Sequence, residues 1–447
     1  MAQLGPFAPM PRLAAGVSGG ADSLALAILA DGWVRARGGS LLALIVDHGL
    51  RPAAAGEAQI TATRLAARGI ATRILTLHDL PHGPLAPGSG LAARARIARL
   101  GILTTACAGA GITDLLLGHH AADQAETVLI RALSASGPAG LAGMAGLRVL
   151  PNLRLLRPLL QLPPAILRDC LRAAGLGWVE DPSNTNPAAL RARLRSLRAD
   201  HAGTGAATWA LHTAAHAAGQ ARARTETATA DWLAAHVSLR PEGFAILPPG
   251  PFPPDALASL IRAIAGAAFP PPSHAIAALA AQPRPTTLAG TRLLPAGRLG
   301  AGQLGTGGLG TGGLRTDQLG AGWLLVREAA AMAPPIPAHH GAIWDNRFRL
   351  GAELGAAYTL GALGADAARL RHRSALPAAV LVSLPAIRQG AAVCAVPHLS
   401  DPDTACWRSV PVLPAMLHPA ATPPFVSPSI AFGYRKSADS HYVHRMR

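Results

Sequence analysis

The sequence predicts an α/β protein: a doubly wound, mostly parallel sheet in the amino-terminal domain, a helical middle region, and a small carboxyl-terminal domain. Three observations support this prediction. In the first 200 residues, short apolar runs alternate with segments of helical spacing, as in successive strand–helix units. From about residue 204 the chain becomes alanine-rich, and residues 300–322 form a glycine tract. The 447 residues accommodate about three domains of roughly 150 residues each.

The expected strands of the first domain, residues 1–203, are continuous apolar runs, as parallel strands covered on both faces require. They cover residues 13–17, 41–46, 72–77 and 114–117. Apolar residues recur at helical spacing near residues 24–29, 60–67, 94–107 and 123–133. In a sheet of this class, ligands bind beyond the carboxyl ends of the strands.

The rest of the chain is less regular. Residues 204–299 are predicted to be a helical middle region, interrupted by proline and glycine clusters at 248–254 and 270–272. The tract at 300–322 is predicted to be a low-complexity linker or loop. Residues 323–447 are expected to form the small third domain and end in a proline-rich segment. The strand-like runs expected in it are residues 343–350 and 378–382.

The charge balance favours a polyanionic partner. Forty basic residues against 24 acidic ones give a formal net charge of +16, which suits RNA, DNA or a membrane surface. Lys436 is the only lysine, so an arginine-rich bias typical of GC-rich coding sequences explains part of this excess. Hydrophobic residues make up 50% of the chain, which excludes a disordered protein.

Cysteine usage and hydropathy indicate the compartment. The four cysteines are scattered, at positions Cys107, Cys170, Cys394 and Cys406. Without a C-x-x-C pair, a disulfide framework, a zinc knuckle or a cysteine-held cluster is disfavoured. No signal-peptide pattern is present, and the uncharged stretches at 263–283 and 409–434 are cut by prolines. We therefore expect a soluble, cytoplasmic protein with no membrane association.

The strongest motif lies between the first expected strand and the first expected helix. It reads Ser18-Gly19-Gly20-Ala21-Asp22-Ser23. The glycines let backbone N–H groups approach a phosphate, the helix amino terminus adds its positive dipole end, and serine hydroxyls can donate to phosphate oxygens. Asp22 is better suited to capping the helix or holding a magnesium ion. The alternative is a glycine-rich turn with a Ser/Asp helix cap.

Other phosphate and nucleophile motifs fit less well. Residues 16–20 match G-x-S-x-G, the nucleophile elbow of α/β-hydrolases, but only 17 residues precede Ser18 and leave no room for earlier strands. A Walker A loop needs a lysine among glycines, which Lys436 lacks. The G-x-G-x-x-G at 305–310 lies in the repetitive tract with no strand before it.

Two polar clusters follow later strands. Asp47 and His48 come directly after residues 41–46, where a nucleotide would be close, although D-H-G also suits a simple turn. His119, His120 and Asp123 follow residues 114–117 and offer a proton acceptor and an acidic group for a metal or an amine. Acidic capping of the first helical turn is the alternative for the second cluster.

A basic stripe follows in the segment after W-V-E-D-P-S-N. Arg191, Arg195 and Arg198 are spaced i, i+4 and i+7, with no acidic residue between Asp181 and Asp200. Such a stripe can track a phosphate backbone, and a solvated helix face is the alternative.

In this order, the motifs resemble the tRNA(Ile)-lysidine synthases, a family of the PP-loop (N-type) ATP pyrophosphatases. The resemblance rests on S-G-G-A-D-S, V-D-H-G-L-R, G-H-H-x-x-D-Q-A-E-T, R-P-L-L at 157–160 and W-x-E-D-P-S-N with trailing arginines. It covers roughly residues 13–200 and is only suggestive at 343–349 and 385–388. Ala122 stands where many members carry another aspartate, and Leu100 replaces the tyrosine of an A-R-x-x-R-Y segment.

The resemblance implies a two-step, ATP- and Mg²⁺-dependent reaction. ATP activates C2 of the wobble cytidine of a CAU-anticodon tRNA(Ile) as an adenylate, and L-lysine then displaces AMP to give lysidine. The resemblance assigns residues 18–23 to ATP binding. It assigns Asp123, together with His119 or His120, to the amine of lysine. It assigns the arginine stripe and residues 323–447 to tRNA. The oligomeric state stays open, with a homodimer as one alternative.

Three other functions fit these motifs less well. A thiolase of the same superfamily would need cysteines to carry sulfur or hold a cluster. An amidating enzyme like GMP synthetase would need an ammonia-supplying segment. A catalytically inactive RNA-binding module would have no need of Asp22, Asp123 and Gln124 together, so their joint presence favours catalysis.

Overall fold

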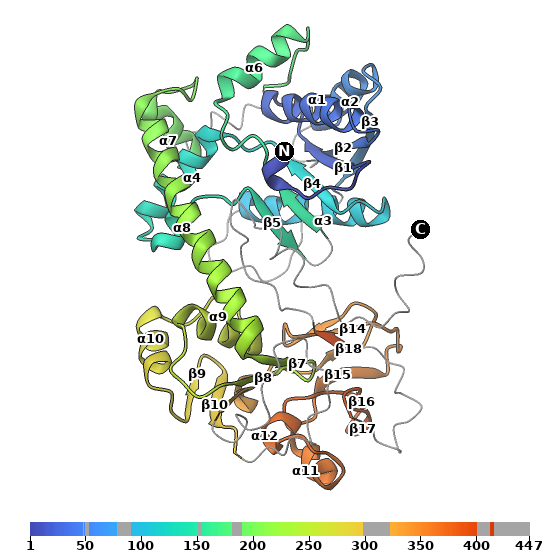
Figure 1. Cartoon of the computed structure of the whole chain (residues 1–447). Helices are drawn as coiled ribbons and strands as arrows, with labels where there is room; N and C mark the ends of the chain where they lie inside the picture. Colours follow the sequence, from blue (N-terminus) through green and yellow to red (C-terminus); the bar gives the residue numbers. More distant parts are fainter. Residues whose placement is uncertain are drawn as a thin grey trace. The chain divides into compact units, whose positions relative to one another are not determined.

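A computed structural model describes most of the chain (Figure 1). The described residues are 1–47, 49, 53–77, 91–150, 153–180, 190–297, 322–399 and 412–414. They form two compact units, Met1–Arg224 and Thr225–Ala420, with the boundary inside helix α8 (Ala206–His236). His48 and residues 300–321 of the glycine tract lie outside the described residues. Among the described helices, none is both long and apolar enough to cross a bilayer.

Unit 1 contains the predicted mostly parallel sheet. Its strands are β1 (Arg12–Val17), β2 (Ser40–Asp47), β3 (Ala71–Thr76), β4 (Asp114–Leu117), β5 (Leu147–Leu150) and β6 (Leu153–Leu156). Their order is β3-β2-β1-β4-β6-β5, and only the β5–β6 pair is antiparallel. This arrangement confirms the predicted fold class.

Helices cover both faces of this sheet, which is why its strands are apolar throughout. Leu13, Ala15 and Val17 of β1 belong to the core that includes α1, whereas Ala14 packs with Leu103 of α3. Burying a leucine of this kind contributes about 1.5–3 kcal/mol. The helices of unit 1 before α8 are α1 (Ala21–Arg35), α2 (Ala54–Ala66), α3 (Leu91–Gly109), α4 (Ala121–Leu133), α5 (Pro138–Leu141), α6 (Pro164–Ala173) and α7 (Leu190–Arg198), with the 3₁₀ turn η1 (Ala2–Leu4) before β1.

The strand order fixes where a ligand would bind. From β1 the chain builds β2 and β3 on one side, and β4 lies on the other side of β1. Connections that leave in opposite directions open a crevice at the carboxyl ends of β1 and β4. The motifs at 18–23 and 119–123 directly follow these two strands.

Unit 2 is more strand-rich than the sequence predicts. Its largest sheet has the order β7-β8-β11-β10-β9 and is antiparallel. The strands are β7 (Ser238–Arg240), β8 (Phe244–Leu247), β9 (Thr286–Leu288), β10 (Thr291–Pro295) and β11 (Trp323–Arg327), and the helices α9 (Pro254–Ala265) and α10 (Ser273–Ala281) share a core with it. Four strands therefore come from the predicted helical region at 204–299. They are three to five residues long, too short to show a clear alternation.

Two smaller sheets complete unit 2. One has the order β12-β15-β16-β17, from β12 (Ile336–Pro337), β15 (Tyr358–Ala362), β16 (Pro385–Gln389) and β17 (Ala392–Ala395). The other has the order β13-β14-β18, from β13 (Ile343–Trp344), β14 (Phe348–Leu350) and β18 (Val412–Pro414). The short helices α11 (Ala367–Leu370) and α12 (Ala378–Leu381) lie between β15 and β16 in the chain.

Two local predictions in this unit were wrong. Residues 378–382 form the helix α12 rather than a strand, because a short apolar run fits either structure and Val380 and Leu381 are buried in a helical turn. Residues 343–350 form a hairpin rather than one strand. Asp345 and Asn346 both have φ of +52°, which reverses the chain between β13 and β14.

Candidate active site

The loop at 18–20 joins β1 to α1 in a conformation that requires glycine. Gly19 has a φ of +86°, in the left-handed region. A Cβ at this position would lie 2.5 Å from Oγ1 of Thr61 on α2. The Gly19 carbonyl also accepts a hydrogen bond from the N–H of Val179 at 2.9 Å. The loop is thus held between α2 and the W-V-E segment, a contact that the sequence does not reveal.

The two serines of the motif have different environments. Ser23 is buried, and its hydroxyl donates to the Gly20 carbonyl at 3.0 Å and accepts from the Ser18 N–H at 3.1 Å. Ser18 is exposed, with its Oγ 3.2 Å from that of Ser23. Ser23 therefore braces the loop from inside, and Ser18 is the hydroxyl accessible to a ligand.

The amino terminus of α1 is available to an anion. Its N-cap is Gly20, which has no side chain to bond the first N–H groups. Asp22 lies in the first turn, and its Oδ1 is buried without a hydrogen-bond partner. A buried carboxylate oxygen without a partner is costly unless a cation or donor reaches it. The geometry is therefore compatible with a phosphate on the helix end and a cation beside Asp22.

The second motif meets the first through a close backbone contact. A Cβ on Gly118 would lie 3.2 Å from backbone atoms of Asp22 and Ser23, so the end of β4 packs directly on the first turn of α1. His120 then places its Nε2 3.4 Å from Oδ2 of Asp22. The structure thus brings together two predicted site residues that are 98 positions apart.

His120 has a defined structural task. It is the N-cap of α4, and its Nδ1 accepts the N–H of Asp123 at 3.3 Å while the Asp123 Oδ2 accepts the His120 N–H at 3.1 Å. Burial lowers the pKa of His120, but the hydrogen bond to Asp22 and the charges of Asp123, Asp22 and Glu126 outweigh burial and raise this pKa overall. With both ring nitrogens engaged, His120 orients the two aspartates and is poorly placed to take a proton from a substrate.

His119 lies in a basic environment. Its Nδ1 is buried without a hydrogen-bond partner. Burial and then the charges of Arg157, Arg96, Arg99 and Arg191 lower the pKa of His119 well below its usual value. His119 is therefore neutral at physiological pH and can accept a hydrogen bond. The sequence shows Arg96 and Arg99 only as the helical A-R-I-A-R segment, with no signal that they surround His119.

The basic stripe packs against a buried acid. Glu126 on α4 is fully buried, and Arg195 forms a two-pronged hydrogen bond with it at 2.9 and 3.3 Å. Arg191 and Arg198 lie 3.6 and 3.8 Å from the same carboxylate. Arg198 also donates to Thr208 and is only 9% exposed, whereas Arg191 is 39% exposed. The sequence misses this pairing because Glu126 is 65 residues before Arg191.

Asp47, another predicted site residue, lies at the carboxyl-terminal edge of the same sheet. Asp47 ends β2, beside β1, and its Oδ1 accepts the N–H of Gly49 at 2.9 Å. This hydrogen bond forms the turn that the sequence analysis gives as the alternative interpretation of D-H-G.

Gln124 has a structural role in α4. It exchanges two hydrogen bonds with the backbone of Met144, at 2.7 and 3.0 Å.

The nucleophile-elbow alternative gains no support. Among the described residues, Ser18 forms its side-chain hydrogen bond with Ser23 and none with a histidine. His120, the histidine next to the loop, is engaged by Asp22 and Asp123 instead. No Ser–His pair is assembled here, as a serine hydrolase requires.

Comparison with known proteins points to one family. Residues 2–199 match the PP-loop domain. The chain is 34% identical to the tRNA(Ile)-lysidine synthase of Ruegeria pomeroyi, over 87% of this chain and 89% of that protein. It is 34% identical to the synthase of Mesorhizobium japonicum, over 79% of this chain and 76% of that protein. A synthase from a Bradyrhizobium species is 42% identical over 49% of this chain, a match that spans 61% of that relative.

Proposed function

This chain belongs to the tRNA(Ile)-lysidine synthase family, and from that premise we propose that it joins L-lysine to the wobble cytidine of a CAU-anticodon tRNA(Ile). ATP activates the C2 oxygen of the base as an adenylate, releasing pyrophosphate. An amine of lysine then attacks C2, and the C–O bond to AMP breaks as the C–N bond forms. The products are lysidine, AMP and pyrophosphate.

One observation supports this assignment most directly. His120 lies 3.4 Å from Asp22 and caps the helix that carries Asp123. The phosphate loop and the histidine–aspartate cluster therefore form one site at the carboxyl ends of β1 and β4. A nucleotide on the loop would have its reacting phosphate close to a group that handles an amine, as a ligase of this kind needs.

The nucleotide end of the site suits ATP with Mg²⁺. The uncapped first turn of α1 would hold the phosphates through backbone N–H groups. Asp22 fits a magnesium ion, because its Oδ1 is buried without a partner and Mg²⁺ prefers carboxylate and phosphate oxygens. When bound, the ion would neutralise charge on the departing pyrophosphate.

The amine end of the site divides its roles among three residues. Only a neutral amine attacks C2, so the lysine ammonium must lose a proton. The Asp123 carboxylate binds that ammonium and accepts its proton, and neutral His119 accepts a hydrogen bond that orients the amine. His120 acts as a positioning residue for Asp22 and Asp123.

The proposal that the protein binds tRNA is supported by its charge. A net charge of +16 and the exposed part of the basic stripe, led by Arg191, favour phosphate contacts along tRNA. We place the protein in the cytoplasm, where its substrates are. Thiolation, the alternative within the superfamily, is less well supported, because the relatives with the longest matches are lysidine synthases.

The test is a single-turnover reaction with radiolabelled lysine, ATP, Mg²⁺ and CAU-anticodon tRNA(Ile), with elongator tRNA(Met) as the RNA control. We expect ATP-dependent label in tRNA(Ile) only. Asp22→Asn should lower the rate by about a hundredfold or more. Asp31→Asn is the matched control, because Asp31 lies on the same helix, outside the Ser18–Ser23 loop, and pairs with Arg35 one turn away. Pyrophosphate release without lysine incorporation would overturn the proposed substrate.

A further inference from the structure

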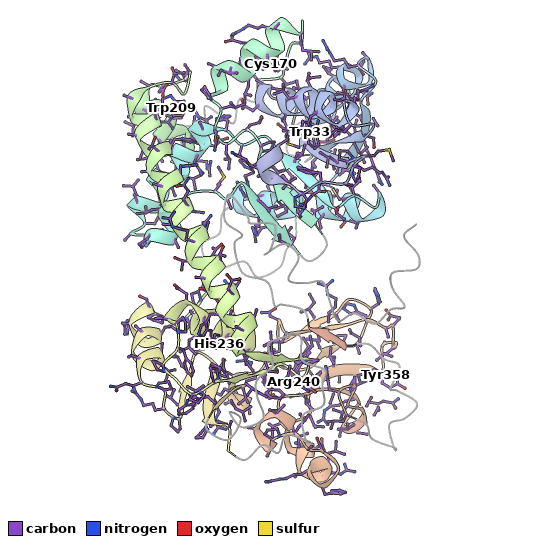
Figure 2. The ribbon with its side chains drawn as sticks, viewed as in Figure 1. Trp33, Cys170, Trp209, His236, Arg240 and Tyr358 are labelled. Atoms are coloured by element: carbon purple, nitrogen blue, oxygen red, sulfur yellow. The ribbon has the colours of Figure 1, made fainter. Side chains whose placement is uncertain are left out.

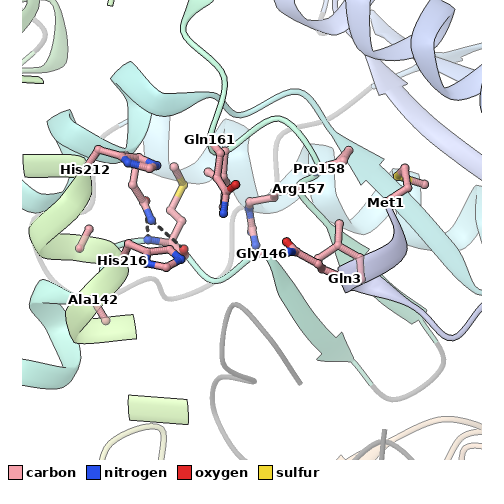
Figure 3. A pocket seen from close by; sticks show the side chains of 14 residues that line it. Met1, Gln3, Ala142, Gly146, Arg157, Pro158, Gln161, His212 and His216 are labelled. Atoms are coloured by element: carbon pink, nitrogen blue, oxygen red, sulfur yellow. Dashed lines mark hydrogen bonds between the residues drawn. The ribbon is translucent and has the colours of Figure 1, made fainter. Parts of the chain in front are cut away.

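Unit 1 contains a cavity that the proposed reaction does not use (Figure 3). It has a volume of about 180 Å³ and is lined by η1, the segment at 142–146, the segment at 157–161 and the first half of α8. Its polar lining residues are Gln3, Gln124, Arg157, Gln161, His212 and His216. The Gln124 amide is committed to Met144 and is not counted among the groups that would bind a ligand.

Arg157 makes this cavity chemically unusual. The residue is only 8% exposed, its Nη1 donates to the Ala145 carbonyl at 2.7 Å, and its Nε is buried without a hydrogen-bond partner. Burial, followed by the charges of Arg96 and Arg148, lowers the pKa of Arg157 to about 10, so the guanidinium stays charged at neutral pH. Among the described residues, no carboxylate forms an ion pair with it. A buried cation without a counter-charge is costly, and an anion would offset that cost.

The other lining groups favour the same ligand chemistry. Among the described residues that line the cavity, none is an aspartate or a glutamate, so none of their side chains carries a charge that repels an anion. Gln3 and Gln161 carry amide donors at its exposed rim. Trp209 lies in the first turns of α8 (Figure 2). His212 and His216 are one turn apart on the same helix. His212 is held by a hydrogen bond to the Leu160 backbone and by an edge-on contact with Trp209, at 5.3 Å between ring centroids.

We propose that this cavity binds a phosphate group, through Arg157 at its base and the side-chain amides of Gln161 and Gln3 at its rim, with His212 and His216 in its wall. Several donors converging on one buried guanidinium suit an anion with several oxygens. The volume of about 180 Å³ exceeds what a chloride ion fills and accommodates a tetrahedral phosphate with part of its substituent. The cavity is separate from the Ser18–Ser23 loop, with which it shares no lining residue.

The phosphate has two sources with the same chemistry: the backbone of an RNA substrate or free inorganic phosphate. Binding of an RNA phosphate rests on the proposed function, whereas binding of free inorganic phosphate does not. In the first case the cavity would hold a phosphate of the bound RNA against the guanidinium of Arg157. The experiment below separates the two sources.

The test titrates inorganic phosphate into the full chain at constant ionic strength and follows the imidazole NMR signals of His212 and His216. These signals are assigned from the spectra of His212→Gln and His216→Gln. Because the proposed function also places phosphate on the Ser18–Ser23 loop, the readout must come from signals inside the cavity. We expect both signals to shift and to saturate together.

Gln161→Glu places a carboxylate at the cavity rim without shortening the side chain. It should weaken phosphate binding by about tenfold or more, through like-charge repulsion. Gln389→Glu is the matched control, because the same change on an exposed residue of unit 2 should alter the affinity by less than about twofold. Signals that do not move in the unaltered protein, or that titrate equally in Gln161→Glu, would overturn the proposal.

A second titration, with an anticodon stem-loop RNA present, identifies the source. Weaker apparent phosphate binding would assign the cavity to the RNA backbone, and unchanged binding would assign it to free phosphate. Lysine incorporation and pyrophosphate release, measured on the same preparation, report on the proposed function separately. Loss of those activities therefore does not imply loss of the phosphate site.

Discussion

Gly19 is the residue that most directly tests the phosphate loop. Gly19→Ala forces a Cβ to within 2.5 Å of Thr61 Oγ1 at a φ of +86°. We expect a stability loss of about 1–3 kcal/mol and at least about a tenfold loss of ATP affinity, because the loop must move to relieve the contact.

Gly20→Ala serves as the control for that prediction. Gly20 has a φ of −70°, and a Cβ there would meet only atoms 3.7 Å or farther away. The free energy of unfolding of Gly20→Ala should stay within about 1 kcal/mol of that of the unaltered protein, since an alanine fits this backbone without strain. Equilibrium ATP binding and denaturant unfolding provide the measurements, and equal losses in both variants would contradict the structural account.

At the scale of elements, Glu126 determines how α7 packs on α4. Glu126→Gln removes the one charge that three arginines share in a fully buried position. We expect unfolding of unit 1 to become easier by about 3–5 kcal/mol, because breaking a buried ion pair leaves unpaired charges behind. Backbone amides of α7 should exchange with solvent much faster than those of α1.

Asp169→Asn is the matched control for the buried acid. Asp169 pairs with Arg172 on α6, and both side chains are more than 60% exposed. Such a surface pair contributes less than about 1 kcal/mol, so α7 exchange should not change. If Glu126→Gln behaved like this control, the arginine cluster would not hold α7 in place.

A second buried acid holds the hairpin β13–β14 in unit 2. Asp345 accepts hydrogen bonds from Arg327 at 2.9 Å and from Arg347 at 2.7 Å, as well as from the Ala333 N–H at 2.9 Å. Burial raises the pKa of Asp345, but these bonds and charges outweigh burial and lower this pKa overall. Asp345→Asn should therefore lower the stability of unit 2 by about 3–5 kcal/mol.

The pH dependence of that loss follows from the lowered pKa. A carboxylate with a lowered folded pKa stabilises the protein above its unfolded pKa, near 3.9, and loses this contribution as pH falls through the folded value. The difference between Asp345→Asn and the unaltered protein should stay constant from about pH 5 to 8 and shrink only in acid. Hydrogen exchange at residues 343–350 across this range measures the stability difference. A difference that varies between pH 6 and 8 would contradict a lowered pKa of Asp345.

At the scale of the whole molecule, the net charge of +16 should make RNA binding strongly salt-dependent. The arginines of α7 are expected to contribute differently to RNA binding and to stability. Arg191→Ala should reduce the slope of log affinity against log salt by about one, because its partly exposed side chain can reach a phosphate. Arg198→Ala should leave the slope nearly unchanged and reduce stability instead, because Arg198 is bonded to Thr208. Filter binding at several salt concentrations distinguishes the two variants, and equal slopes would contradict this division.

The sequence by itself determined the parallel-sheet domain and the local identity of its motifs. Apolar runs such as residues 41–46 mark buried strands wherever both sheet faces are covered, and S-G-G-A-D-S marks a strand-to-helix turn. These signals are local, because strand and turn preferences act over a few residues. In unit 2 the same approach found too few strands, since three-residue strands such as Ser238–Arg240 depend on pairing with partners far along the chain.

Only the tertiary structure decided how the site is assembled. It placed His120 against Asp22, engaged both nitrogens of that ring, and buried His119 near arginine charges that lower its pKa. It also turned the basic stripe inward onto Glu126 and left the buried guanidinium of Arg157 beside an open cavity. Each of these outcomes depends on distance and burial between residues far apart in the sequence. The sequence therefore names the candidate groups of the site, and packing determines which of them are already engaged by other parts of the protein.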